Sequence, residues 1–207
     1  MSNADQDKNM PKIPNKILLL LSSLLLVFGH SQEARTAEKQ TKPNLETATF
    51  AAGCFWGVQE FFRKIPGVVE TRVGYTGGSK DNPKYEETND GSTGHAESVE
   101  LKFDPAKVSY DHLLDQFFKI HDPTTKNRQG NDIGTQYRSA IFYHNEKQKQ
   151  AAIAFKEKVE KSKAWKSEIT TEISEAKKFW PAEDYHQNYL VKNPGGYDNH
   201  FLRKLSF

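Results

Sequence analysis

The order in which short apolar segments follow one another most constrains the fold of this 207-residue chain. Some segments alternate apolar and polar residues, as half-buried strands do, and others repeat apolar residues at helical spacing. Strands are expected over residues 47–53, 67–75, 97–104, 139–144 and 169–174. Helices are expected over residues 54–64, 110–120 and 146–162, with a short helix from about 181 towards 190. This alternation predicts one domain that combines helices with a sheet.

The first six of these segments run strand, helix, strand, strand, helix, strand. That order predicts an α+β fold, a two-layer sandwich with a ferredoxin-like β-α-β-β-α-β core whose helices pack on a mixed or antiparallel sheet. Ser109 directly precedes the second of these helices and is expected to be its N-cap. The polar stretches 74–93 and 122–138 are longer than about 12 residues, and loops of that length in a compact domain usually carry function.

The N-terminal residues have the layout of a secretory signal peptide. Residues 17–28 carry no charge, and Lys8, Lys12 and Lys16 precede them as a basic region. This apolar run is shorter than the roughly 17–25 residues that span a bilayer. We therefore expect residues 1–31 to be a signal peptide, with an uncleaved signal anchor as the alternative, and the protein to be exported to the periplasm or secreted.

The rest of the chain divides into two expected parts. Residues 32–46 are rich in Lys, Glu, Thr and Gln and contain almost nothing apolar, so a flexible linker is expected there. Residues 47–207 are expected to form the catalytic domain. If the leader is cleaved, this domain has no membrane attachment.

Charge and histidine usage exclude two classes of function. The 29 Lys and Arg residues nearly balance the 27 Asp and Glu residues, for a net charge of +2, whereas nucleic-acid recognition needs a basic excess on one face. The seven histidines are scattered without the spacing of metal ligands. We therefore expect neither a nucleic-acid partner nor a metal site.

Cys54 is the one cysteine of the chain, which excludes a disulfide framework, a zinc ribbon and a CxxC redox pair. It lies between an expected strand and an expected helix, where the helix N-terminus would lower the pKa of a thiol. A buried structural cysteine is the alternative. Because an unpaired thiol in an oxidising compartment is a liability unless it is used, we interpret Cys54 as reactive.

Aromatic and acidic residues near Cys54 and in the loops are further candidates. Phe55 and Trp56 are either core residues or an apolar wall beside the thiol. Glu97, in the GHAE motif, is either a solvated residue at a sheet edge or a partly buried carboxyl that acts as a general acid.

The polar loops add phenols and a carboxylate, and a later motif adds a histidine. Tyr85 and Tyr137 are either surface residues or two donors that converge on one small oxygen, and Asp132 lies in the same loop as Tyr137. Asp184 and His186 are expected on the first turn of the last helix. His186 is interpreted as a structural residue, with a catalytic base as the alternative.

Six motifs then occur in one order: GCFWG, GYTGG, NPKYEE, TGHAE, RQGNDIGTQYRS and AEDYHQNYL. Together they closely resemble the A-type peptide methionine sulfoxide reductase family over residues 48–197. The resemblance implies a two-layer α+β sandwich with long coils. It also implies reduction of the S epimer of methionine sulfoxide, free or in proteins, as repair of oxidative damage. No metal or organic cofactor is implied.

The same resemblance implies a role for each candidate. Cys54 is the nucleophile that becomes a sulfenic acid, and Glu97 donates a proton to the sulfoxide oxygen with hydrogen bonds from Tyr85 and Tyr137. The remaining residues bind the substrate, by holding its methyl group or orienting it: Phe55, Trp56 and Asp132.

This chain departs from the many family members that carry resolving cysteines. Asp198 follows the C-terminal GGY segment, and the chain has no second cysteine that could form a disulfide with Cys54. The resemblance therefore implies that an external thiol, from thioredoxin, glutaredoxin or a small molecule, reduces the sulfenic acid. A monomer is expected, since a repair enzyme must reach varied methionine side chains.

Three other functions compete with this interpretation. A cysteine hydrolase would pair Cys54 with His186 as its base, and would turn over esters or amides. A peptide-binding module would keep its binding after Cys54→Ser and would consume no reductant. A B-type sulfoxide reductase would use the other epimer of the substrate.

Overall fold

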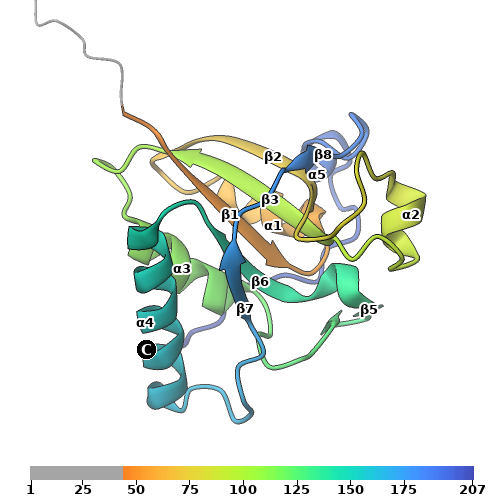
Figure 1. Cartoon of the computed structure of the whole chain (residues 1–207). Helices are drawn as coiled ribbons and strands as arrows, with labels where there is room; N and C mark the ends of the chain where they lie inside the picture. The colour runs from red at the N-terminus through yellow and green to blue at the C-terminus, as the bar shows by residue number, and fades with distance from the viewer. Residues whose placement is uncertain (1–43) are drawn as a thin grey trace, which may run out of the picture. The chain divides into compact units, whose positions relative to one another are not determined.

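The computed structural model describes residues 44–207 (Figure 1). The expected signal peptide, and the expected linker up to residue 43, lie outside the described residues. A six-stranded sheet forms from these strands: β1 (Glu46–Ala52), β2 (Val68–Thr76), β3 (Ala96–Phe103), β6 (Ser139–Tyr143), β7 (Glu172–Glu175) and β8 (Trp180–Pro181). The α-helices are α1 (Phe55–Phe62), α2 (Tyr85–Asn89), α3 (Tyr110–Ile120), α4 (Glu146–Ser162) and α5 (Tyr189–Lys192). Thus β1 begins at Glu46, the last residue of the expected linker.

The topology of the sheet confirms the predicted ferredoxin-like core. Its strand order is β7-β6-β1-β3-β2-β8. The four strands β6, β1, β3 and β2 pair antiparallel, and β7 adds to one edge in parallel with β6. The chain passes from β1 through α1 to β2 and from β3 through α3 to β6, so two crossover helices connect these four strands.

Helices cover one face of the sheet, where the main core lies. Alternate residues of β1 point to this face, among them Phe50, whose ring stacks on those of Phe62 in α1 and Phe117 in α3 at centroid distances of 5.3 Å. A smaller cluster fills the opposite face: Ala51, Ala96, Ala140 and Phe142. Ser109 caps α3 as predicted, since its side chain accepts a hydrogen bond from the His112 amide.

The two long loops contain more regular structure than the sequence predicts. The first holds α2, and the second holds a hairpin of β4 (Arg128–Gln129) and β5 (Asp132–Ile133) followed by a 3₁₀ helix, Thr135–Tyr137. Such short elements leave no periodicity in the sequence. The expected helix from about 181 is wrong, because β8 occupies its start and α5 begins only at Tyr189. Asp184 and His186 therefore lie in turns that Gln187 ties to the Val73 backbone of β2.

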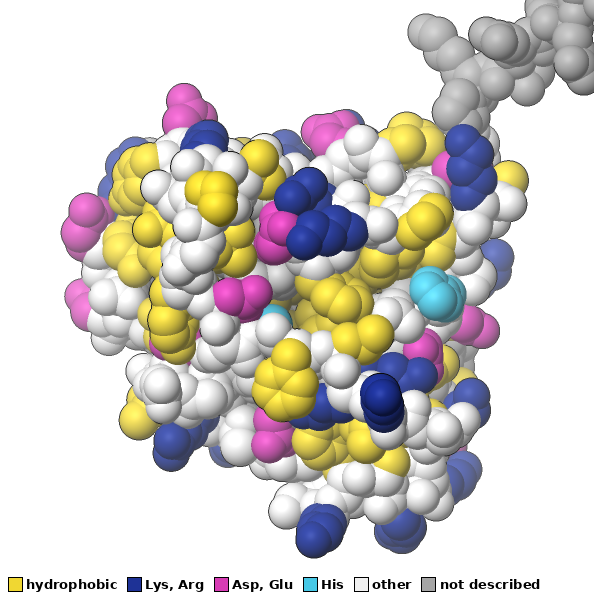
Figure 2. Space-filling model, turned by 180° about the vertical axis from the view of Figure 1, so that it is seen from behind, with side chains coloured by type: hydrophobic (Ala, Val, Ile, Leu, Met, Phe, Trp, Pro, Cys, Tyr) yellow, Lys and Arg dark blue, Asp and Glu magenta, His cyan; other side chains and the backbone are white. Residues whose placement is uncertain are grey.

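The visible surface carries both signs of charge. Figure 2 shows Lys and Arg side chains together with Asp and Glu across one face, with hydrophobic side chains between them. Within residues 44–207, no helix has the length and apolar character that crossing a membrane requires.

Candidate active site

Cys54 lies at a sharp turn between β1 and α1. Gly53 has a φ of 94°, a conformation that favours glycine, and this lets the chain leave β1 and enter α1 within two residues. Cys54 is therefore the residue immediately before the first turn of α1. Its side chain is buried, with 7% of the residue exposed.

The first amide groups of α1 point into the site, because they have no carbonyl partners within the helix. The N–H of Phe55 donates to Oε2 of Glu97 at 3.1 Å, and the backbone N–H groups of Trp56 and Gly57 act on the Cys54 thiol by lowering its pKa. The start of one short helix therefore contacts both the thiol and the candidate acid.

The predicted direction of the Cys54 pKa is wrong. Burial raises the pKa of the thiol well above its ordinary value, and the negative charge of Glu97 raises it further when that group is ionised. The two α1 amides lower it, as predicted from the helix N-terminus, but they do not outweigh the loss of solvation of a thiolate. Cys54 is therefore a protonated thiol at neutral pH.

Glu97 reaches Cys54 because of the sheet register. β3 runs antiparallel to β1, with Val99 opposite Phe50, so the start of β3 lies beside the end of β1. Glu97 is only 3% exposed. Burial raises its pKa to about 8, with a contribution from the Asp132 charge, although the hydrogen bond from the Phe55 amide acts in the opposite direction. At neutral pH the carboxyl group keeps a proton that it can donate.

One pocket contains the seven residues to which the family resemblance gives a role, and Tyr197 as an eighth residue; Asp184 and His186 do not line it. Its lining residues are Cys54, Phe55, Trp56, Tyr85, Glu97, Asp132, Tyr137 and Tyr197. They come from five separate segments of the chain, between β1 and the C-terminal tail. The pocket therefore combines a thiol, the protonated carboxyl group of Glu97, the side chain of Asp132, three phenols and the aromatic rings of Phe55 and Trp56.

Two phenols lie on short elements of the long loops. Tyr85 is the first residue of α2, and its amide donates to Glu183 at 3.1 Å. Burial, with a smaller contribution from Glu97, raises the pKa of Tyr85 to about 12. The Tyr137 hydroxyl donates to Oδ1 of Asn89, at the end of α2, at 3.0 Å. Both phenols keep their protons at neutral pH and can serve as hydrogen-bond donors.

The turn before α5 supports the aromatic side of the pocket. Nε1–H of Trp56 donates to Nδ1 of His186 at 3.0 Å, and the Trp56 ring stacks on Tyr189 at a centroid distance of 3.8 Å. His186 also contacts the rings of Phe55 and Tyr85. Among the described residues, no hydrogen bond joins Cys54 to His186, so the pair that a cysteine hydrolase needs is not formed.

The C-terminal tail closes another side of the pocket. The Tyr197 hydroxyl donates to Asp132 at 3.0 Å, and Asn199 donates to the same carboxylate at 2.9 Å. Nε2–H of His200 donates to the Ala52 carbonyl at 2.7 Å, just before Cys54. A side chain at Gly57 would collide with Asp198 and His200, so glycine there allows the tail to approach α1.

Asn89 and Asn199 support the pocket through contacts with distant parts of the chain, and nothing local in the sequence distinguishes them. Tyr197 belongs to the GGY segment, which the sequence singled out only for its missing cysteine. Glu183 lies in the AEDYHQNYL motif, which was the one available signal for it. His95, two residues before the acid in GHAE, accepts a hydrogen bond from the Gly78 amide and so organises the first loop. No group of three or more metal-ligating side chains occurs within residues 44–207.

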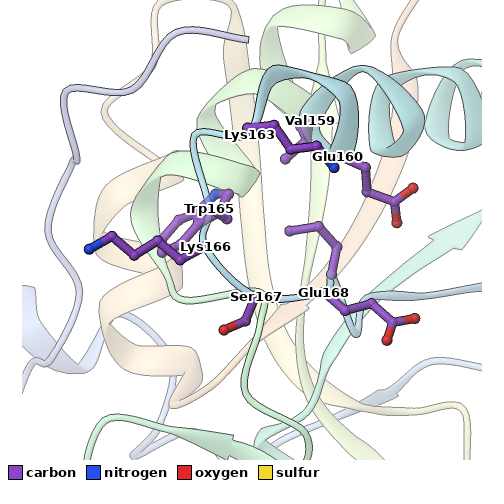
Figure 3. A pocket seen from close by; sticks show the side chains of 8 residues that line it. Val159, Glu160, Lys163, Trp165, Lys166, Ser167 and Glu168 are labelled. Carbon is purple, nitrogen blue, oxygen red and sulfur yellow. The ribbon is translucent and has the colours of Figure 1, made fainter.

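Another hollow lies at the C-terminal end of α4. Figure 3 shows Trp165 and Lys166 on one side of it, Glu168 on another, and Lys163 beside Val159 and Glu160 at the end of the helix. It shares no lining residue with the Cys54 pocket, and its lining contains neither a thiol nor a histidine. We assign it no part in the chemistry of the chain.

Comparisons with known proteins show the family to which this chain is similar. The model of the peptide methionine sulfoxide reductase family matches residues 46–205. A peptide methionine sulfoxide reductase MsrA from Methanosarcina acetivorans is 55% identical over 175 residues, which cover 84% of this chain and 92% of that protein. The MsrA from Geobacter sulfurreducens is 58% identical over 153 residues, 74% of this chain and 94% of that protein.

Solved structures of proteins related to this chain lead to the same family. Reduced Mxr1 from Saccharomyces cerevisiae has a TM-score of 0.74 and 39% identity, over 80% of this chain and 98% of that chain. Methionine sulfoxide reductase A of Corynebacterium diphtheriae has a TM-score of 0.72 and 42% identity, over 80% and 82%. Mxr1 in complex with Trx2 has a TM-score of 0.54 and 27% identity, over 80% and 97%. This chain therefore belongs to the peptide methionine sulfoxide reductase family and reduces methionine sulfoxide.

Proposed function

We propose that this enzyme reduces the S epimer of methionine sulfoxide, free or in proteins, with Cys54 as nucleophile and Glu97 as general acid. One observation carries the proposal: the Cys54 thiol and a carboxyl group whose pKa is about 8 line the same small pocket. A proton donor that remains protonated at neutral pH suits a reaction in which a sulfoxide oxygen departs from sulfur.

The reaction balances with these two groups. The Cys54 sulfur attacks the sulfur of the sulfoxide, and Glu97 gives its proton to the oxygen as the sulfur–oxygen bond breaks. The released hydroxyl group then adds to the Cys54 sulfur as the sulfur–sulfur bond formed by the attack breaks. Methionine leaves, Cys54 becomes a sulfenic acid, and the thiol proton replaces the one that Glu97 donated. Two electrons pass from the Cys54 sulfur to the substrate sulfur. Tyr85 donates a hydrogen bond to the oxygen as negative charge develops on it, and Tyr137 does so when its hydroxyl turns from Asn89 to the substrate.

The remaining lining residues bind the substrate. Phe55 and Trp56 provide an apolar surface for the methyl group, and contact with an aromatic ring suits a polarisable sulfur substituent. Because the phenols and Glu97 fix the oxygen while these rings fix the methyl group, one configuration at sulfur fits. Asp132, held by Tyr197 and Asn199, orients the rest of the substrate. A monomer leaves the pocket open to methionine residues in proteins.

Regeneration requires a thiol from another molecule. Two external thiol groups convert the Cys54 sulfenic acid back to the thiol, with release of one disulfide and one water. The chain has no second cysteine that could provide one of them. A related structure, Mxr1 in complex with Trx2, supports a protein reductant, and a glutaredoxin or a small-molecule thiol is the other source we propose.

Export is part of the proposal and is supported by the sequence of residues 1–31 alone. Cell fractionation of the full chain, with the N-terminal residue of the exported product determined by mass spectrometry, tests it. We expect the product to begin at Gln32. Retention of the intact chain in the cytoplasm would contradict export, and an intact chain in the membrane fraction would indicate the signal anchor.

The activity test uses separated R and S epimers of a methionine sulfoxide peptide, with dithiothreitol as reductant. We expect turnover of the S epimer only, with none by Cys54→Ser. Trapping of the sulfenic acid with a carbon nucleophile, followed by mass spectrometry, should place it on Cys54. Turnover of the R epimer by the wild type, or of the S epimer by Cys54→Ser, would overturn the proposal.

A further inference from the structure

His186 contacts the aromatic side of the pocket without lining the pocket itself. We infer that His186 is a positioning residue that fixes the Trp56 indole for the substrate methyl group, through a hydrogen bond that only the neutral imidazole ring can accept. This inference rests on the proposed function for the role of Trp56, but the hydrogen bond itself does not depend on that function.

The indole of Trp56 is held at one edge and on one face. At its edge, Nε1–H donates to Nδ1 of His186 at 3.0 Å. On its face, Tyr189 stacks at 3.8 Å with an interplanar angle of 12°. Stacking alone leaves an aromatic ring free to slide within its plane, whereas the hydrogen bond fixes where the edge points. His186 therefore contributes the directional part of the constraint on Trp56.

The imidazole also packs against one ring from each chemical half of the pocket. It is 1% exposed. Its centroid lies 5.1 Å from that of Phe55, on the methyl-binding side, and 4.5 Å from that of the phenol donor Tyr85. Tyr185 packs against it at 4.1 Å. A change in the position of this ring would therefore alter its packing against both Phe55 and Tyr85.

The hydrogen bond dictates the protonation state of the ring. An indole N–H is only a donor, so Nδ1 of His186 must accept and the ring proton must reside on Nε2. In the described part of the chain Nε2 has no hydrogen-bond partner, so the bond to Trp56 is the one that orients the ring. Protonation of Nδ1 would place two donors against each other and break it.

The surroundings favour the neutral ring. Burial lowers the pKa of His186, and the nearby carboxylates of Glu183 and Glu86 act in the opposite direction without reversing the shift. The remaining titratable groups that face the ring are the phenols of Tyr85 and Tyr185. The bond to Trp56 is therefore present at neutral pH and is lost in acid.

The test measures the reductase step alone. Without reductant, each enzyme molecule releases one methionine, because Cys54 is the only thiol. The rate of that release at increasing substrate concentration gives a maximal rate and a half-saturating concentration. We expect His186→Leu, which keeps apolar volume but offers no acceptor, to raise the half-saturating concentration about tenfold and to change the maximal rate less than threefold. That tenfold change corresponds to about 1.4 kcal/mol.

Three companion variants separate positioning from a general structural role. His186→Asn places an amide oxygen near the position of Nδ1 and should restore most of the substrate affinity. In a Trp56→Phe background, which lacks the indole N–H, His186→Leu should raise the half-saturating substrate concentration less than twofold. His112→Leu, at an exposed position on α3, is the matched histidine control and should behave as the wild type.

Nuclear magnetic resonance supplies a readout independent of activity. The Trp56 indole N–H resonance should move in His186→Leu, and in the wild type it should titrate in acid in parallel with substrate affinity. The indole resonances of Trp165 and Trp180 serve as internal references. An unmoved Trp56 resonance, or an equal loss from His186→Leu with and without Trp56, would overturn the inference. Failure of the wild type to release methionine from the S epimer would instead overturn the proposed function.

Discussion

The amide N–H of Phe55 donates a hydrogen bond of 3.1 Å to the carboxyl group of Glu97. The residue that follows the nucleophile in the sequence therefore holds the acid in place, although the two residues are 42 positions apart. Any movement of the α1 N-terminus shifts the thiol and the proton donor together. The reacting groups are thus fixed relative to each other before a substrate arrives.

Replacing Glu97 by Gln should lower the single-turnover rate of methionine release by roughly 10²–10⁴-fold, the usual contribution of a general acid. Glutamine keeps the size of the side chain and its acceptor for the Phe55 amide but has no acidic proton. Stopped reactions with the S-epimer peptide would measure the rate. A loss below tenfold would show that another group supplies the proton.

The reductase rate of the wild type should fall as the pH rises through about 8, the pKa of Glu97. Above that pH the carboxyl group loses the proton that it donates, and the new negative charge opposes nucleophilic attack by a neighbouring sulfur. A profile of single-turnover rate between pH 6 and pH 10 checks this. A rate that rises through pH 8 would indicate that ionisation of the thiol limits the step instead.

The free energy of unfolding should also depend on whether Glu97 is protonated. Its pKa rises from 4.5 to about 8 on folding, so between those values the native state binds a proton that the unfolded state does not. The contribution of this proton to the free energy of unfolding is fully present below about pH 4.5. It should decline by up to about 1.4 kcal/mol per pH unit until pH 8. Denaturant unfolding should show this decline weakened in Glu97→Gln. The exposed Glu168→Gln should keep the wild-type pH dependence.

Tyr85→Phe and Tyr137→Phe should each lower the reductase rate by about 10- to 100-fold, because a hydrogen bond to a developing charge contributes about 1.5–3 kcal/mol. The double variant should lose less than the product of the two effects if Glu97 compensates. Tyr143→Phe, on β6 and outside the pocket, is the matched control. Equal rates for both pocket variants and the control would remove the phenols from the mechanism.

His200→Leu should destabilise the fold by about 1–3 kcal/mol, since it leaves the Ala52 carbonyl without its 2.7 Å partner. It should also raise the half-saturating substrate concentration, because Tyr197 is held on the same tail. Thermal unfolding together with single-turnover titration would measure the two effects. An unchanged melting temperature would show that the tail contact contributes nothing to the fold.

The local sequence was sufficient to predict the core and the turn that holds Cys54. Phe50 and its alternate neighbours identified β1, and GCFWG identified its junction with α1, because both patterns lie within about ten consecutive residues. The seven candidate residues were chosen from family motifs, and the fold brings them to one pocket. Their roles remain predictions.

The structural features that the sequence did not predict depend on contacts between distant segments of the chain. Helix α2 is five residues long and has no periodicity to detect. Tyr197 lines the pocket only because its tail is tied to Asp132 and Ala52. The pKa of Cys54 was predicted from the helix N-terminus, but its direction is set by burial, which the sequence around the cysteine does not reveal.

The tail has a consequence for the timing of synthesis. Arg203 bonds to Lys119, Phe207 packs against the core, and Tyr197 completes the pocket around a thiol placed some 140 residues earlier. A growing chain cannot assemble this pocket until the segment that carries Tyr197 has left the ribosome. The newly made domain therefore gains its catalytic competence only after this late segment has emerged, when the preceding strands and helices are already available to fold.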